Sequence, residues 1–193
     1  MHIIMSDEGA DINRKFFKNI SAEYLMAKIK HMEKHNRDMF CRFIYMGKAL
    51  IDYCTEGDLK NFKRLFADSD DKEIMYWHMQ KCFKAAMKAR KLNMVEFIIE
   101  ELDMPLNHEA FDGYLHTFIF MCQGAEMSKD DLQKEIDRQL LRYLVTGFGR
   151  DGLNPIEKAT GNTPLITACK LLKDPIIIET LVDHGADVNA VNI

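Results

Sequence analysis

The chain of 193 residues has four Pro, one Trp and no long uninterrupted apolar run. No run approaches the ~18 residues that a membrane-spanning helix requires. The first residues, Met1 to Glu8, show neither the basic segment nor the apolar segment of a secretory signal. Alternation of polar and apolar residues, typical of half-buried strands, is nearly absent. The sequence therefore predicts an all-α protein without a membrane span, and we expect it to be cytoplasmic.

The cysteines are odd in number, five, and none of them form a Cys-x-x-Cys pair. Disulfide frameworks use even numbers of cysteines, and structural zinc sites use closely spaced pairs. Each cysteine has helical, apolar surroundings, which predicts reduced thiols that serve as small core residues in a reducing compartment. They are Cys41, Cys54, Cys82, Cys122 and Cys169. We expect no metal and no cofactor.

Three short motifs imitate chemical sites but lack the context that those sites require. The run Gly147–Gly152 reads Gly-x-Gly-x-x-Gly, but a dinucleotide site needs a strand before it, and here a helical segment precedes. His31 and His35 have metal-ligand spacing without an evident third ligand. The run Asp68–Glu73 lacks the glycine and glutamate of a calcium loop. The sequence predicts a protein that is not an enzyme.

Charge is unevenly distributed along the chain. Residues 14–48 carry nine Lys or Arg and three Asp or Glu (9 − 3 = +6), whereas the rest carries 17 and 27 (17 − 27 = −10). Basic residues also recur at helical spacing farther on, at Lys81, Lys84, Lys88 and Lys91. An ordinary solvated face is one interpretation, and an acidic protein partner is the next. Nucleic acid comes last, because exposed stacking aromatics are not evident.

The last 35 residues carry an ordered series of turn and cap signals. Gly161 permits a tight turn, Thr163 can cap a helix, and Pro164 suits the first helical position. Gly185 fits the left-handed position just past a helix end. Together with the small Ala168 between them, this order closely resembles one ankyrin repeat over residues 158–192.

Earlier repeats are indicated by spacing. Leu59 to Leu92 is 92 − 59 = 33 residues, and Phe62 to Val95 is also 95 − 62 = 33, which matches the ankyrin period. The resemblance implies a stack of antiparallel helix pairs, because one repeat buries its apolar face only against neighbours. We expect about four repeats, preceded by a basic N-terminal helical cap. The cap is 1–47 and the repeats are 48–80, 81–113, 114–157 and 158–193.

The predicted cap has two helices, one from Ser21 to about His35 and one starting near Asn36. We expect the second helix to cover the end of the stack through apolar side chains, namely Met39, Phe40, Phe43 and Ile44. At the other end, Leu181 and Val182 are expected near an incompletely covered face.

The third repeat is longer than the pattern. Ser128 and Asp131 resemble a capping box, and residues 125–139 would extend the second helix by roughly three turns. The insertion is either simply tolerated or functional. In the fourth repeat, Ile166 replaces the usual His, so the polar network of that His is expected to be absent.

The resemblance implies a non-catalytic protein–protein interaction module or a structural subunit of an intracellular assembly. The alternative is that the basic N-terminal helices bind nucleic acid or another acidic surface. Carried over position by position, the candidate partner-binding residues of the turn tips are His108, Glu109, Phe111, Asp112, Tyr114, Asn162 and Ile166. The four lysines named above complete the candidate set.

Overall fold

The computed structural model describes residues 22–69, 72–102, 113–127, 131–172 and 174–192. The chain divides into two compact units, residues 1–104 and 105–193. The described residues form helices and contain no strand, which confirms the predicted all-α class. No helix of the described part combines the length and apolarity needed to cross a membrane.

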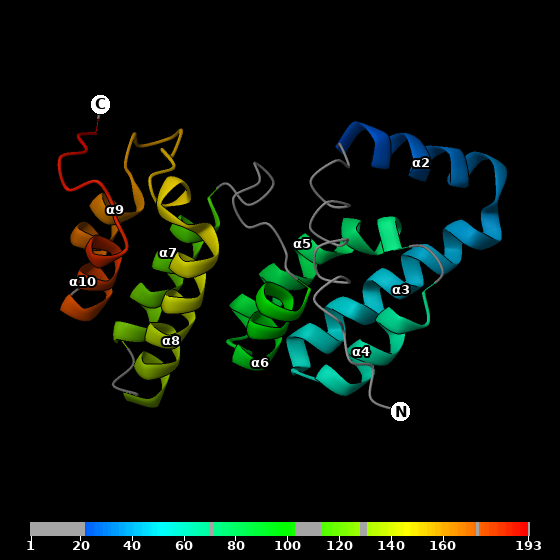
Figure 1. The fold of residues 1–193 in the computed structure, drawn as a ribbon, viewed down its shortest axis with the longest axis horizontal. Coiled ribbons are helices and arrows are strands. Elements are labelled where there is room, and N and C mark those ends of the chain that lie inside the picture. Colours follow the sequence, from blue (N-terminus) through cyan, green and yellow to red (C-terminus); the bar gives the residue numbers. More distant parts are fainter. Residues whose placement is uncertain (1–21, 70–71, 103–112, 128–130, 173, 193) are drawn as a thin grey trace. The chain divides into compact units, whose positions relative to one another are not determined.

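The N-terminal unit is a set of packed helices (Figure 1). Helix α3 packs against α4 and α5, helix α5 packs against α6, and α2 packs against α3 and α5. A π-helical turn, η1, continues α6. The elements are α2 (Ala22–His35), α3 (Arg37–Glu56), α4 (Leu59–Ala67), α5 (Lys72–Lys88), α6 (Leu92–Glu96) and η1 (Phe97–Glu101).

The first helix of the predicted cap ends at His35 and the second begins after Asn36, as expected. The predicted capping residue Ser21 lies outside the described residues. The Asn36 side chain accepts a hydrogen bond from the Met39 amide at 3.1 Å and so begins α3. However, α3 runs on to Glu56 and crosses the predicted 47/48 boundary. The cap and the first predicted repeat therefore share one helix.

The prediction for the apolar side chains of the cap is half right. Phe43 is buried and forms a cluster with Met32, and Phe40 packs against that cluster. Met39 and Ile44 are 40% and 52% exposed, so the prediction is wrong for these two. Both side chains are exposed on the surface of α3.

Aromatic packing links the helix pairs of the N-terminal unit. Phe62 of α4 is fully buried, and its ring meets Phe97 edge-on with the ring centroids 5.7 Å apart. The Asn93 side chain donates a hydrogen bond to the Gly57 carbonyl at 3.0 Å. Lys63 pairs with Glu101 at 2.8 Å. These contacts join residues 35 to 38 positions apart (97 − 62, 93 − 57 = 36, 101 − 63), close to the 33-residue period.

The C-terminal unit contains two helix pairs (Figure 1). Helix α7 packs against α8 and α9, and α10 packs against α8 and α9. The elements are α7 (Tyr114–Met127), α8 (Asp131–Phe148), the 3-10 turn η3 (Arg150–Leu153), α9 (Pro164–Leu171) and α10 (Pro175–Asp183).

Both cap predictions for the last repeat are confirmed. The Thr163 hydroxyl accepts a hydrogen bond from the Ile166 amide at 3.4 Å, and Pro164 opens α9. Gly185 has φ 102°, and its amide donates to the Val182 carbonyl at 2.9 Å. The next amide donates to Leu181, which completes a Schellman motif. Leu181 is fully buried, so its expected place near an uncovered face is wrong, whereas Val182 is 39% exposed.

Helix α8 has 18 residues and α10 has nine, which agrees with an extended second helix in the predicted third repeat. However, residues 125–127 of the expected extension belong to the end of α7. The nine extra residues amount to about two and a half turns. The capping residue Ser128 lies outside the described residues. The helix ends at Phe148 and Gly149 has φ 63°, so the glycine-rich run ends a helix, as expected.

The cysteines are free thiols in two environments. Cys54, Cys82 and Cys122 are buried, as predicted for core residues. Cys41 and Cys169 are exposed, so the core interpretation is wrong for these two. Each lies on the outer face of a helix whose other face is buried.

Candidate interaction surfaces

The predicted turn-tip residues have different environments. Tyr114 and Asn162 are buried, and burial raises the pKa of the Tyr114 hydroxyl. Asn162 accepts a hydrogen bond from Lys170 at 2.9 Å, and Ile166 is half-buried. Tyr114 and Asn162 are therefore interior residues of the C-terminal unit that offer a partner little surface. The remaining four lie outside the described residues: His108, Glu109, Phe111 and Asp112.

Two finger tips, which we define as residues 154–161 and 186–192, expose apolar side chains. The first tip is a tight turn in which the Gly161 amide donates to the Glu157 carbonyl at 2.8 Å, with φ 67° at Gly161. Ile156 is 64% exposed at this tip, and Val188 and Val191 are 63% and 84% exposed at the other. These three exposed side chains contribute little to the core, and they form the main apolar surface of the two tips.

A hydrogen bond joins the two finger tips. The Asp187 amide donates to the Asn154 side-chain oxygen at 2.9 Å, and the Asp187 carboxylate accepts from the Asn189 amide at 2.9 Å. Asn154 and Asp187 are 33 positions apart, one repeat period. The hydrogen bond between Asp187 and Asn154 therefore connects the ends of two successive predicted repeats.

His116 forms a buried polar network of the kind that was expected to be absent around Ile166. The His116 Nε2 lies 3.0 Å from the Pro155 carbonyl, and its Nδ1 lies 3.4 Å from the Thr167 hydroxyl. Because a carbonyl only accepts, Nε2 carries the proton and Nδ1 accepts from Thr167. His116 is the third residue of α7, as Ile166 is of α9. The network is thus present in the preceding repeat, and the Leu-His pair at 115–116 was the signal that could have revealed it.

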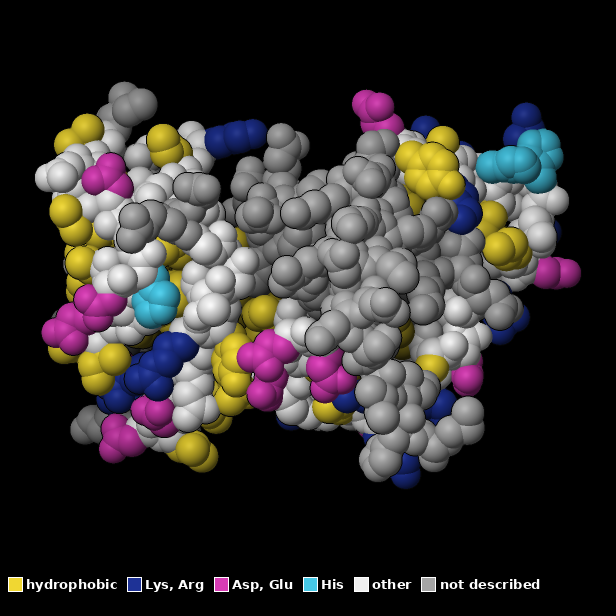
Figure 2. All heavy atoms as spheres, viewed as in Figure 1, with side chains coloured by type: hydrophobic (Ala, Val, Ile, Leu, Met, Phe, Trp, Pro, Cys, Tyr) yellow, Lys and Arg dark blue, Asp and Glu magenta, His cyan; other side chains and the backbone are white. Residues whose placement is uncertain are grey.

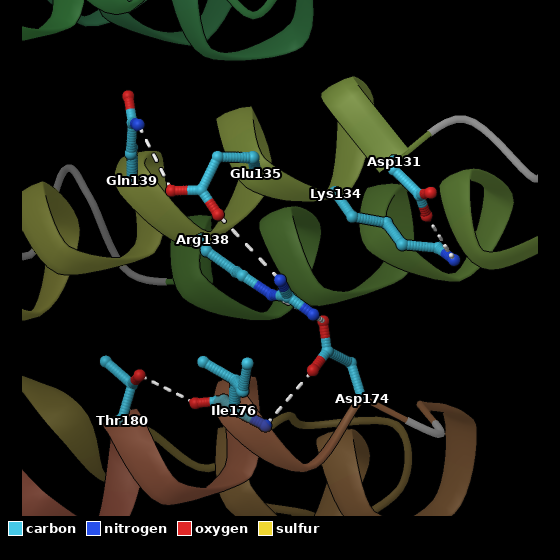
Figure 3. A network of polar contacts seen from close by, with 8 residues as sticks. All are labelled: Asp131, Lys134, Glu135, Arg138, Gln139, Asp174, Ile176 and Thr180. Atoms are coloured by element: carbon cyan, nitrogen blue, oxygen red, sulfur yellow. Dashed lines mark hydrogen bonds and ion pairs between the residues drawn. The ribbon is translucent and has the colours of Figure 1, made fainter.

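Helices α8 and α10 are joined by an ion pair (Figure 3). Arg138 donates two hydrogen bonds to the Asp174 carboxylate, both at 2.9 Å. The other oxygen of Asp174 accepts from the Ile176 amide at 3.1 Å and caps α10. The hydrogen bond to Asp174 raises the pKa of Arg138. The network connects α8 to the start of α10, and we regard it as structural.

The lysines predicted as a basic stripe are not equivalent. Lys81, Lys84 and Lys88 are exposed along α5, where positions i, i+3 and i+7 share a face. Lys91 is half-buried, and a Cβ added to Gly57 would lie 3.0 Å from its Cδ. The exposed stripe therefore has three lysines, because the stem of the fourth covers the Gly57 turn.

Helices α3 and α5 approach closely at a buried histidine. A Cβ added to Gly47 would lie 2.1 Å from the His78 ring. His78 is 5% exposed, and its ring centroid lies 4.4 Å from that of Phe43. Burial, and secondarily the charge of Lys81, lower the pKa of His78 to about 4. Its Nε2 has no hydrogen-bond partner among the residues that the structure describes. We infer a packing role, because the neutral ring fills the space that Gly47 leaves.

The comparison with protein families concerns the end of the chain, where both helix caps lie. Residues 160–193 match the family model of the ankyrin repeat. This confirms the resemblance for the last repeat, and ankyrin repeats are typically non-catalytic modules of protein–protein interaction. Searches of curated proteins and of solved structures found no significant match. The assignment of residues 48–157 to further ankyrin repeats stays a prediction.

Proposed function

We propose that this chain is a non-catalytic protein-binding subunit of an intracellular assembly, and that its C-terminal unit contacts the partner through the two finger tips. The observation that carries the proposal is the pair of exposed apolar side chains, Ile156 and Val188, on adjacent tips of an ankyrin-type unit. Burial of an apolar side chain contributes about 1.5–3 kcal/mol. Two such anchors suffice to make the tips the centre of an interface.

The neighbouring polar groups support a protein as the partner. The Asp187 carboxylate accepts a hydrogen bond from the Asn189 amide within the second tip, and the Thr160 hydroxyl donates one to the Glu157 carboxylate in the first. These bonds satisfy part of the hydrogen-bonding capacity of the tips, and a protein partner can supply the remaining donors. An apolar centre surrounded by satisfied polar groups is typical of protein interfaces.

Affinity purification with tagged full-length chains tests the finger tips. We expect the double variant I156D/V188D to lose the protein partners that the wild-type chain retains, because a carboxylate at each anchor would be buried unpaired. Leu132→Asp is the matched control, since Leu132 is 70% exposed on α8 and away from the tips. Equal recovery of partners by the double variant and the wild type would contradict the proposal.

The second candidate function is binding of an acidic surface or nucleic acid by the N-terminal unit. The exposed lysines of α5 favour it: Lys81, Lys84 and Lys88. Phosphate contacts weaken steeply with salt because each one releases counterions. A complex whose affinity falls about a thousandfold between 50 and 200 mM salt, and which I156D/V188D leaves unchanged, would support this candidate over the first.

A further inference from the structure

A groove of about 590 Å³ follows one flank of α2 and reaches the first turn of α3. Its wall on α2 includes Tyr24, Lys28, His31 and His35, at intervals of three or four residues that keep side chains on one side of a helix. Figure 2 shows imidazole rings, basic side chains and apolar side chains close together over the C-terminal part of α2. The surface therefore combines an apolar groove with positive charge.

The apolar part of the groove offers both a fixed and an adaptable surface. Met32 is 6% exposed and belongs to the buried cluster with Phe43, so it forms a firm base. Tyr24 and Met39 are 51% and 40% exposed. Methionine side chains adjust to irregular partner shapes, and tyrosine is frequent among residues that dominate binding energy.

The charged part of the groove has one sign. None of its lining residues is acidic, whereas Lys28 is a cation and the imidazoles of His31 and His35 can donate hydrogen bonds to a carboxylate. Lys34 and Arg37 are exposed at the adjacent corner between the helices. The acidic residues of α2, Glu23 and Glu33, do not line the groove.

We propose that the groove binds an acidic amphipathic helix of a partner protein. The wall from Tyr24 to His35 spans 11 residue steps, about 16 Å, which matches roughly three turns of a bound helix. Apolar anchors at i, i+3 or i+4, and i+7 of that helix would meet Tyr24, Met32 and Met39. Its carboxylates would face Lys28 and the two histidines. This surface lies in the N-terminal unit and does not depend on the finger tips.

The proposal favours a helix over nucleic acid for two reasons. Nucleic acid binding relies on rows of Lys or Arg that follow the phosphate backbone, and Lys28 is the one such residue among those that line the groove. Two of the three basic residues in the groove are histidines. The lining residue that is most buried is Met32, whose side chain ends in a thioether. A thioether base suits an apolar anchor better than a phosphate.

The probe is a synthetic fluorescein-labelled peptide of about 16 residues, with Leu along one helical face and Glu along the other. Binding to the full-length chain is measured by fluorescence anisotropy. We expect Met39→Glu to weaken binding at least about tenfold, and added salt to weaken binding to the wild-type chain. Met26→Glu is the control, because Met26 is 39% exposed on α2 but does not line the groove, and Met39 is 40% exposed. This control should change the affinity less than about twofold.

Other outcomes overturn the proposal. The occupant is not an acidic amphipathic helix if the peptide fails to bind, or if a scrambled peptide or one with Lys for Glu binds as tightly. Met39-dependent self-association in sedimentation would identify a second copy as the occupant. Met39-dependent binding of single-stranded RNA would identify nucleic acid. Ala27→Trp, which adds bulk to the groove wall from an exposed position, must also weaken binding, and it serves as the test if Met39→Glu does not fold.

Discussion

The two units stabilise similar helix pairs in different ways. In the C-terminal unit, side chains cap both helices of the last repeat, Thr163 for α9 and Asp174 for α10. In the N-terminal unit, Asn36 and Asp58 cap α3 and α4, whereas α6 begins at Lys91 without a side-chain cap. There α3 and α5 also pack closely at Gly47. The cap residues make the last repeat recognisable in the sequence, so a helix pair that lacks one of them is harder to recognise from its sequence even where its helices pack closely.

The largest expected effect concerns the close approach in the N-terminal unit. Gly47→Ala should lower the free energy of unfolding by about 3 kcal/mol, because the buried His78 ring has no room to move away. At an exposed helical position the same change would stabilise by about 1 kcal/mol, so the sign of the change is informative. Urea unfolding followed by Trp77 fluorescence measures it, since Trp77 is the one tryptophan of the chain. The double variant with His78→Ala should recover part of the loss, and full additivity would contradict this account.

His78 also predicts a dependence of stability on pH. Its pKa is lowered to about 4, whereas an unfolded histidine has a pKa of about 6.5. Between these values the unfolded state binds a proton that the folded state does not, so stability falls as the pH decreases from about 6.5 to about 4. The loss should reach about 3 kcal/mol. In a His78→Leu variant, the slope of Trp77-detected unfolding against pH should be shallower, and an unchanged slope would assign the effect to other groups.

The caps of the C-terminal unit should give a smaller effect. Asp174→Ala removes both the cap of α10 and the partner of Arg138, and should cost about 2 kcal/mol. Asp174→Asn keeps a cap oxygen and should cost about half as much. Far-UV circular dichroism melting measures both changes. If Asp174→Asn is as damaging as Asp174→Ala, the charge outweighs the cap in this unit.

The smallest expected effect is a gain in stability. Arg90 has φ 57° and follows Gly57, which has φ 81°, by 33 positions (90 − 57). Left-handed backbone costs a non-glycine residue about 1 kcal/mol, so Arg90→Gly should stabilise the N-terminal unit by about 0.5 kcal/mol after the entropy of the unfolded chain is included. Urea titration detects this change. A loss of stability would mean that contacts of the Arg90 side chain outweigh the backbone strain.

Local signals made much of the fold predictable from the sequence. The Asn36 cap, the Thr163-Pro164 start and the Gly185 end each act within one turn of helix, so their effect does not depend on distant residues. The extension of α8 was also predictable, because its apolar positions keep helical spacing.

Which side of each helix is buried was less predictable, because burial depends on which neighbouring helix covers that side. Met39 and Cys41 look like core residues in the sequence but are both exposed on α3, and Leu181 is buried in α10, where an uncovered face was expected. The groove could not be predicted at all, since it is formed by the angle at which α2 meets α3. His116 was missed because the expected histidine was sought at position 166.

The hydrogen bond between Asp187 and Asn154 has a consequence for the thermodynamics of recognition. Loops that move independently must each lose conformational entropy when a partner immobilises them. Two tips that share a hydrogen bond are already partly ordered together, so less entropy remains to be lost on binding. The two bonded residues lie one repeat period apart along the chain, and their hydrogen bond would preorganise a two-point contact surface on the C-terminal unit.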